Sequence, residues 1–245
     1  MAYKVEKVLP EDSSEKSKAQ QVEQMFDDIA PAYDTLNHTL SINLDKRWRR
    51  QAMEVLQEIS PKKILDIATG TGDLAIEAAR RLQPDSILAV DLSEKMMEVG
   101  KIKVEKLGLQ NLIKFQKEDS CSLTLTSSEF DAAMVAFGVR NFENLDRGLQ
   151  EMLRILRPGG RLVILELSTP ECFPMKQGYK IYSKLIPLLG KIISRNDTAY
   201  RYLPKSIEAF PQNEKMVDIM LNNGFSKASF KLLSAGICTM YIGEK

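Results

Sequence analysis

Three aspartates in this chain each lie at or near the end of an apolar run, and the first of them precedes a glycine turn. These residues are Asp66, Asp91 and Asp119, and the turn after Asp66 contains Gly70 and Gly72. Two glycines so close behind a strand let the backbone approach a ligand. Acids at the carboxyl ends of successive parallel strands line the ligand crevice of an open α/β sheet. One such acid alone would be an ordinary strand-end residue, but the set of three predicts a cofactor site.

The glycine turn by itself leaves two kinds of cofactor open. Gly70, Gly72 and Ala75 match the pattern G-x-G-x-x-G/A, and Asp91 follows Gly70 by 21 residues. That spacing is close to the place of the ribose-binding acid in a dinucleotide fold, so the local pattern is compatible with NAD. Asp66 counts against NAD, because its negative charge would face the pyrophosphate.

S-adenosylmethionine fits the three acids better, because it has no phosphate and carries an ammonium and a sulfonium. Asp66 can offset the ammonium, and Asp91 can accept hydrogen bonds from the ribose hydroxyls. Asp119 can accept from the exocyclic amine of adenine, while the backbone amide of Ser120 donates to a ring nitrogen. The acids therefore favour an S-adenosylmethionine site.

The hydrophobic pattern predicts that these residues lie on an α/β sheet. Short β-rich runs alternate with helical segments, which is typical of parallel strands joined by right-handed crossovers. Two β-like runs at the end of the chain suit an antiparallel hairpin, an ending that differs from the six-stranded dinucleotide fold. The expected strands cover 62–68, 86–91, 111–119, 130–138, 161–167, 224–233 and 236–243, with a Pro-Gly-Gly turn at 158–160. The expected helices cover 19–29, part of 37–60, 73–82, 93–106, 144–156, 174–194 and 212–222.

The composition indicates a single globular domain. The chain has 245 residues, 44% of them hydrophobic and 27% charged, which suffices for one large α/β domain. A formal net charge of +1 argues against a nucleic-acid binder. The three cysteines follow no metal or redox spacing, so we expect reduced thiols, no bound metal and a cytoplasmic protein. The polar start predicts a flexible tail at 1–18 and no signal peptide, with one domain over 19–245.

Several longer stretches make the chain resemble a known family. They are LDIATGTGD (65–73), AVDLSEKMM (89–97), FGVRNF (137–142), YDTLNHTLSINLDKRW (33–48) and RILRPGGRLVILELS (154–168). Together they resemble the class I S-adenosylmethionine-dependent methyltransferases, and more narrowly the ubiquinone/menaquinone biosynthesis C-methyltransferases. The resemblance implies a Rossmann-like, mostly parallel seven-stranded sheet with a C-terminal antiparallel hairpin. It also implies an N-terminal helical lid at 19–60 and a substrate-side insertion at 174–211.

The same resemblance implies a reaction and the residues that perform it. The reaction is methylation of a ring carbon of a prenylated quinol, with demethylmenaquinol favoured over a methoxybenzoquinol. Arg140 and Asn141 are expected to orient the quinol oxygen or a catalytic water, with Asp119 polarising them. A structural alternative is that Arg140 only pairs with an acid such as Asp119. The further cofactor contacts implied are Thr69, Leu92, Ala136 and Tyr33, the last of which lies in the lid.

Two departures from the family pattern concern the expected site. Ala68 stands where the first glycine of the methyltransferase loop is common, and Asp45 stands where the first signature usually has histidine. The substitution at Asp45 leaves no basis for assigning chemistry to that position. His38 is the sole histidine, but it lies at a variable position in a polar turn. We therefore expect His38 to be a solvated or capping residue rather than a general base.

The segment at 178–195 has an apolar stripe and three lysines on another face. Such a helix usually packs on its own domain. A basic amphipathic helix can also contact a membrane surface, where a prenyl tail would enter. The sequence therefore leaves open a peripheral contact with the inner membrane face, and it leaves open whether the protein forms a homodimer.

Overall fold

The computed structural model describes residues 2–179 and 197–245, and its centre is one seven-stranded sheet. The strand order is β3-β2-β1-β4-β5-β7-β6, in which the first five strands are parallel and β7 is antiparallel to both of its neighbours. The predicted α/β class and the terminal hairpin are confirmed. The strands are β1 (Lys63–Ile67), β2 (Ser86–Asp91), β3 (Ile113–Lys117), β4 (Phe130–Ala136), β5 (Leu156–Leu167), β6 (Lys227–Leu233) and β7 (Cys238–Glu244).

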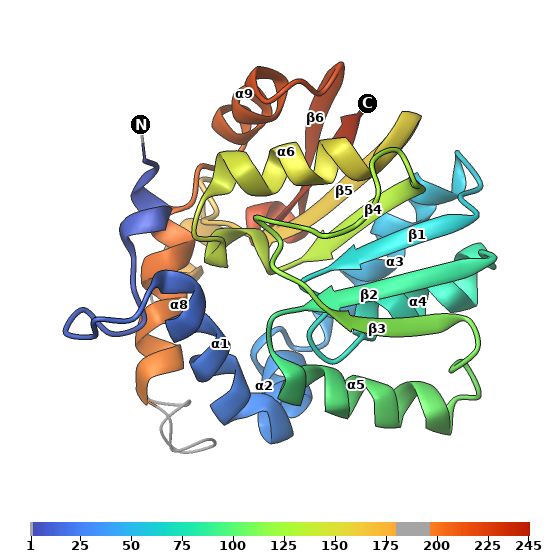
Figure 1. Cartoon of the computed structure of the whole chain (residues 1–245). Coiled ribbons are helices and arrows are strands. Elements are labelled where there is room, and N and C mark those ends of the chain that lie inside the picture. The colour runs from blue at the N-terminus through green and yellow to red at the C-terminus, as the bar shows by residue number, and fades with distance from the viewer. Residues whose placement is uncertain (1, 180–196) are drawn as a thin grey trace.

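Helices cover both faces of this sheet (Figure 1). One face packs against α3 (Leu44–Gln57), α4 (Asp73–Leu82) and α5 (Glu94–Lys106), and the other against α6 (Leu145–Ile155) and α9 (Glu214–Asn222). The central strands are buried on both sides, and they are accordingly rich in Ile, Leu, Val and Ala. This two-faced burial fixes the edge at which the parallel strands end.

A third layer lies at the carboxyl edge of the parallel strands (Figure 1). It consists of α1 (Lys18–Ile29), α2 (Tyr33–Leu40) and α8 (Asp197–Ala209). A small separate core joins α1 to α8, with Met25 and Ile29 packed in one cluster with Tyr200 and Tyr202. Because this core is distinct from the two that cover the sheet, the layer encloses the strand ends without being part of the main core.

The start of the chain does not behave as the predicted flexible tail. Residues Lys4–Lys7 form a short 3-10 helix, and Val5 is buried in a core cluster. The Lys18 ammonium donates to the carbonyls of Val5 (2.7 Å) and Arg140 (3.1 Å), which ties the start of the chain to the loop after β4. Burial lowers the pKa of Lys18 to about 8. The polar composition of residues 1–18 therefore gave no sign that Val5 and Lys18 are buried.

The other expected elements agree with the structure except in three places. The Pro-Gly-Gly turn at 158–160 exists as a bulge inside β5, where the register with β4 shifts. Residues 197–209 form α8, which the sequence analysis treated only as a polar, aromatic segment. The turn expected before α3 is shorter because α2 occupies 33–40. Most of the expected helix at 174–194, and its apolar stripe, lie outside the described residues.

The loop after β1 depends on an unusual pair of small residues. Ala68 has φ = 51°, a left-handed conformation that glycine adopts more easily. A Cβ atom on Gly138 would lie 2.6 Å from the Ala68 Cβ atom, so the missing side chain at 138 makes room for Ala68. Alanine can therefore stand at position 68, where a glycine was expected, because Gly138 after β4 has no side chain.

Candidate functional site

Two cavities open at the carboxyl edge of the sheet and share a wall made by Phe26, Tyr33 and Phe137. We call them the loop cavity, which the glycine loop lines, and the aromatic cavity, which α8 lines. Phe137 has φ = 61°, a strained conformation for a non-glycine residue, and it directly follows β4. The two cavities are therefore neighbours, and ligands in them would both contact these three side chains.

The loop cavity collects most of the predicted cofactor residues. Tyr33 lies over the glycine turn, since its ring is 3.9 Å from where a Cβ atom of Gly70 would be. The predicted residues that line this cavity are Tyr33, Gly70, Asp91, Leu92, Asp119, Ser120, Ala136 and Asn141. The sequence therefore predicted residues in five separate segments that line one cavity.

Asp91 is held rigidly at the end of β2. Its Oδ2 atom accepts from the Gly70 amide (2.8 Å), and its Oδ1 atom accepts from the Ser93 amide (2.9 Å). Ser93 caps α5 as expected, accepting from the Met96 amide, and its hydroxyl donates to Asp27 on α1. Burial raises the pKa of Asp91, although these amide bonds oppose the shift. Each carboxylate oxygen keeps acceptor capacity for a ligand hydroxyl.

Three of the predicted cofactor residues lie behind the cavity wall instead of in it. Asp66 is 1% exposed, and its Oδ2 atom accepts from the Thr69 hydroxyl (2.5 Å) and the Ala75 amide (3.1 Å). Gly72 has φ = 78°, and a Cβ atom there would lie 3.1 Å from the Phe115 ring. Asp66, Thr69 and Gly72 thus shape the loop and do not line the cavity itself.

The Asp66 carboxyl nevertheless carries an unusual buried charge. Its Oδ1 atom has no hydrogen-bond partner among the described residues. Burial raises the pKa of Asp66 to about 7, against the opposing bonds from Thr69 and Ala75. An unpaired buried carboxylate close behind the loop favours a cationic group on the ligand side.

The aromatic cavity is mostly apolar, and Arg140 is its cationic group. Arg140 pairs with Glu166, whose Oε1 atom lies 2.7 Å from the guanidinium and whose Oε2 atom accepts from the Arg140 amide. The guanidinium also donates to the Phe137 carbonyl. Arg140 thus pairs with an acid, as the structural alternative had it, but the acid is Glu166 and not Asp119, which lines the loop cavity and accepts from the Cys121 amide at 2.8 Å.

Three polar atoms at this edge are buried without a partner among the described residues. Arg140 Nε and the Tyr202 hydroxyl belong to residues that line the aromatic cavity, and Asn141 Oδ1 belongs to one that lines the loop cavity. Burial raises the pKa of Tyr202, so its hydroxyl is protonated and available as a donor. Buried polar groups normally have partners, and these are therefore positioned to bind a ligand oxygen.

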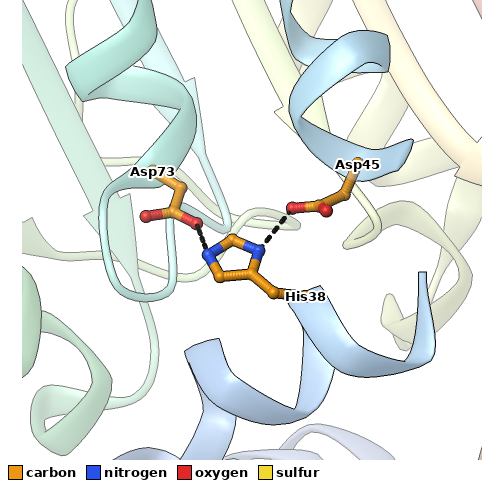
Figure 2. A group of neighbouring side chains, drawn as sticks. All are labelled: His38, Asp45 and Asp73. Carbon is orange, nitrogen blue, oxygen red and sulfur yellow. Dashed lines mark hydrogen bonds and ion pairs between the residues drawn. The ribbon is translucent and has the colours of Figure 1, made fainter. Parts of the chain in front are cut away.

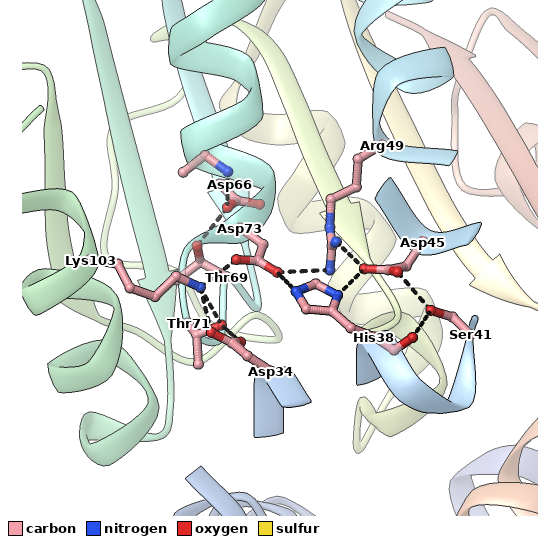
Figure 3. A network of polar contacts seen from close by, with 11 residues as sticks. Asp34, His38, Ser41, Asp45, Arg49, Asp66, Thr69, Thr71, Asp73 and Lys103 are labelled. Carbon is pink, nitrogen blue, oxygen red and sulfur yellow. Dashed lines mark hydrogen bonds and ion pairs between the residues drawn. The ribbon is translucent and has the colours of Figure 1, made fainter. Parts of the chain in front are cut away.

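His38 is partly exposed, and it also makes contacts with two carboxylates that the sequence did not predict. Its Nδ1 atom lies 2.9 Å from Asp45 Oδ2, and its Nε2 atom lies 3.8 Å from Asp73 Oδ2 (Figure 2). Arg49 bridges the same two carboxylates, as Figure 3 shows. Ser41 donates to Asp45 Oδ1 at 2.6 Å. These contacts join α2, α3 and the start of α4.

The grouping of His38, Asp45 and Asp73 contains side chains of metal-ligating types. The two carboxylates already have cationic partners, because Arg49 contacts both and Lys103 contacts Asp73. Lys103 also bonds Asp34 at 2.7 Å, which extends the network toward the lid. We therefore treat the cluster as an ion-pair network and assign no metal to it.

Sequence reasoning missed three residues that shape the aromatic cavity. Glu166 lies inside an apolar strand, and a lone acid in such a run was the available signal. Tyr202 is one of several aromatics in the segment that forms α8, and nothing in the pattern distinguished it. The strained Phe137 left no trace in the sequence, because only the backbone conformation reveals it.

Comparison with known proteins finds relatives that match almost the whole chain. The model of the ubiE/COQ5 methyltransferase family matches residues 14–245. A demethylmenaquinone methyltransferase from Bacteroides fragilis is 54% identical over 246 aligned positions, with 100% of both chains covered. A demethylmenaquinone methyltransferase from Porphyromonas gingivalis is 46% identical, with 98% of each chain covered.

Solved structures share the fold at low sequence identity. An Aquifex aeolicus SAM-dependent methyltransferase superposes with a TM-score of 0.56 at 18% identity, covering 79% of this chain and 88% of that one. The [4+2]-cyclase SpnF superposes with a TM-score of 0.57 at 18% identity, covering 93% and 96%. A cyclase with this fold shows that the architecture alone does not fix the reaction.

Proposed function

The chain belongs to the ubiE/COQ5 methyltransferase family, and we propose that it transfers a methyl group from S-adenosylmethionine to a ring carbon of demethylmenaquinol. The names of its full-length relatives support this choice of quinol over a methoxybenzoquinol. The observation that carries the proposal is the pair of adjacent cavities, one lined by the glycine loop and the strand-end acids and the other by aromatic side chains, that share Phe26, Tyr33 and Phe137. Membership of the family sets aside the alternative of an NAD-dependent oxidoreductase.

We assign the loop cavity to S-adenosylmethionine. Asp91 would accept from the ribose hydroxyls, and Asp119 with the Ser120 amide would bind the adenine edge. Asp66 acts from behind the wall, where its buried charge favours the ammonium without touching it. When bound, S-adenosylmethionine supplies an activated methyl group, so the protein mainly aligns the reactants and excludes water.

We assign the aromatic cavity to the quinol ring and the start of its prenyl tail. Arg140 and Tyr202 present unpartnered donors that would bind a quinol oxygen and stabilise its anion. Asn141 would hold a water or the same oxygen from the adjoining cavity. Glu166 keeps Arg140 oriented and neutralises its charge when no quinol is bound.

Transfer of labelled methyl from S-adenosylmethionine tests the proposal directly. Demethylmenaquinol and a methoxybenzoquinol are offered in parallel, and label should appear in the first product at the higher kcat/KM. Equal or greater transfer to the benzoquinol would overturn the choice of substrate. S-adenosylhomocysteine should raise the melting temperature, whereas NAD(H) should leave it unchanged.

We propose that the protein meets its substrate at the cytoplasmic surface of a membrane. No helix within the described residues is long and apolar enough to cross a bilayer. The contact is therefore assigned to the basic, apolar segment at 178–195, on the sequence pattern alone. Co-sedimentation with anionic vesicles should weaken when its lysines are changed to glutamate, and unchanged binding would contradict this assignment.

A further inference from the structure

The proposed reaction requires a proton acceptor beside the quinol, and the predicted carboxylate Asp119 lines the other cavity. Methylation of a quinol ring carbon replaces a C–H bond by a C–CH3 bond and releases one proton per turnover. The nucleophile forms when a quinol hydroxyl gives up its proton first. After transfer, the ring carbon loses its hydrogen as a proton and the oxygen regains one, which leaves the net release of one. Arg140 cannot accept this proton, because its guanidinium stays charged.

Asp45 is the sole carboxylate among the described residues that line the aromatic cavity. Four tyrosines also line it, namely Tyr33, Tyr179, Tyr200 and Tyr202. A tyrosine hydroxyl is ordinarily protonated at neutral pH, and burial raises the pKa of Tyr33 and Tyr202 further. Asp119 faces the other cavity. Asp45 is therefore the one ionised acceptor that the described wall offers to a quinol hydroxyl.

Asp45 does not stand alone, because its neighbours connect the cavity to solvent. Its Oδ1 atom accepts from Ser41, which also lines the cavity, and its Oδ2 atom contacts His38 Nδ1. The His38 side chain is 26% exposed, whereas that of Asp45 is 3% exposed. His38 thus connects the buried carboxylate of Asp45 to solvent. Figure 2 shows its ring between Asp45 and Asp73.

The charges around Asp45 and His38 suit a proton acceptor that passes its proton on. Burial opposes the shift, but the hydrogen bond from Ser41 and the charge of Arg49 lower the pKa of Asp45, so the carboxyl does not retain a proton. Asp73 faces the outer nitrogen of His38, and Arg49 contacts both carboxylates. The remaining charged groups that face the cluster, from α2 and α5, are Asp34 and Lys103 (Figure 3).

We propose that Asp45 accepts the quinol hydroxyl proton, directly or through Ser41, and that His38 relays it to solvent. This inference rests on the proposed function, since it needs a quinol in the aromatic cavity. In the transfer, the O–H bond breaks, its electron pair stays on the quinol oxygen, and an O–H bond forms on Asp45. Neutral His38 then accepts that proton at Nδ1, the resulting imidazolium gives the proton on Nε2 to water, and exchange with solvent returns the ring to its starting tautomer before the next turnover. His38 acts through Asp45, so it is a relay residue and not a catalytic one.

Replacement of the relay residue gives the decisive test. In His38→Ala, kcat should fall at least about 10-fold, with little change in KM for either substrate. Added imidazole should restore kcat in proportion to its concentration, because the exposed position admits an external acceptor. In Asp45→Asn, kcat should fall about 100-fold and imidazole should not restore it, since the first acceptor is missing.

Asp34→Asn is the matched control. The substitution removes one carboxylate from the same network. The Asp34 carboxylate pairs with Lys103 and Thr71 but does not contact His38. Its turnover should not respond to imidazole. A response equal to that of His38→Ala would mean that the network only holds the lid, and the relay would be wrong.

A second readout does not depend on turnover. The chain has one histidine, so the imidazole resonances in an NMR spectrum belong to His38 without assignment. A soluble naphthoquinol without a prenyl tail, added with S-adenosylhomocysteine, should shift these resonances in the wild type but not in Asp45→Asn. Equal shifts in both proteins would contradict the coupling through Asp45.

The outcomes separate this inference from the proposed function. Wild-type turnover of His38→Ala and Asp45→Asn, in an enzyme that methylates demethylmenaquinol, would refute the relay and leave the function intact. Absence of methyl transfer by the wild-type protein to any quinol would refute the function itself. Binding of S-adenosylhomocysteine to each variant, measured by its melting temperature, confirms that the variants are folded.

Discussion

At the residue scale, the Arg140–Glu166 pair shows why single substitutions at this site need care. Both side chains are buried, so loss of either charge leaves the other uncompensated. Breaking such a pair typically costs about 3–5 kcal/mol of stability. A fall in activity of Arg140→Ala would therefore mix catalysis with folding.

Arg140→Lys avoids that problem, because it keeps a cation beside Glu166 and removes the unpartnered Nε donor. We expect kcat to fall about 100-fold, since the quinol anion loses one preorganised donor. The affinity for S-adenosylhomocysteine should be retained, because Arg140 lines the other cavity. Calorimetric titration and steady-state kinetics measure the two quantities, and a normal kcat would contradict the proposed role.

A second residue-scale prediction concerns Asp66. Its folded pKa of about 7 lies above the ordinary value of 3.8, so its contribution to stability is complete below pH 3.8 and is lost as pH rises through 7. Asp66→Asn lacks this titration. From pH 4 to pH 7.5, the unfolding free energy should shift in favour of the variant by up to about 4 kcal/mol. Urea unfolding of both ligand-free proteins measures this, and a difference that is constant with pH would contradict the raised pKa.

At the element scale, the loop after β1 and the loop after β4 are fitted to each other. Ala68 in the first loop occupies the space that the missing side chain of Gly138 leaves in the second. These two loops bound the loop cavity and also lead to Arg140 and Asn141. The packing of these two loops against each other therefore sets the relative positions of the two proposed ligands.

Gly138→Ala should destabilise the protein by about 1–3 kcal/mol, because the new methyl would lie 2.6 Å from the Ala68 Cβ atom. The double variant Ala68→Gly/Gly138→Ala should recover most of that loss, since it moves the methyl group to the other loop. Denaturant unfolding of the two single variants and the double variant forms a complete cycle. Additive losses would show that the two positions do not interact.

At the scale of the whole molecule, the layer of α1, α2 and α8 covers the edge at which the parallel strands end. The polar contacts that fasten α1 and α2 to the sheet domain include Asp27 with Ser93 at 2.6 Å and Asp34 with Lys103 at 2.7 Å. Ser93 lines the loop cavity, and Lys103 belongs to the ion-pair network that includes Asp73. We propose that this layer closes over the cofactor.

Hydrogen exchange tests that closure. S-adenosylhomocysteine should slow exchange of the amides in residues 25–45, because bound ligand packs against Tyr33 and Phe26. The hairpin of β6 and β7 lies at the far edge of the sheet and should be unaffected. Equal exchange of residues 25–45 with and without the ligand would mean that this layer is not a lid.

The sequence alone determined the order of the elements, the ends of most strands and the surface of the loop cavity. Alternation of apolar runs with helical segments decides the parallel part of the sheet, and the strand-end acids must then meet at one edge. Asp91, Asp119 and Gly70 were predictable for that reason. Family motifs identified Arg140 and Asn141 in the same way, through their place after β4.

Only the tertiary structure decided which charges meet. Glu166, and not Asp119, pairs with Arg140, because β5 lies beside β4 whereas Asp119 follows the more distant β3. His38 and Asp45 lie seven residues apart, across the turn between α2 and α3, so helical periodicity did not predict their contact. Pairing across a turn depends on backbone conformation, and the left-handed conformation of Ile42 at this turn has no sequence signature. The sequence therefore specified the edge where chemistry occurs, and the folded backbone specified the partners.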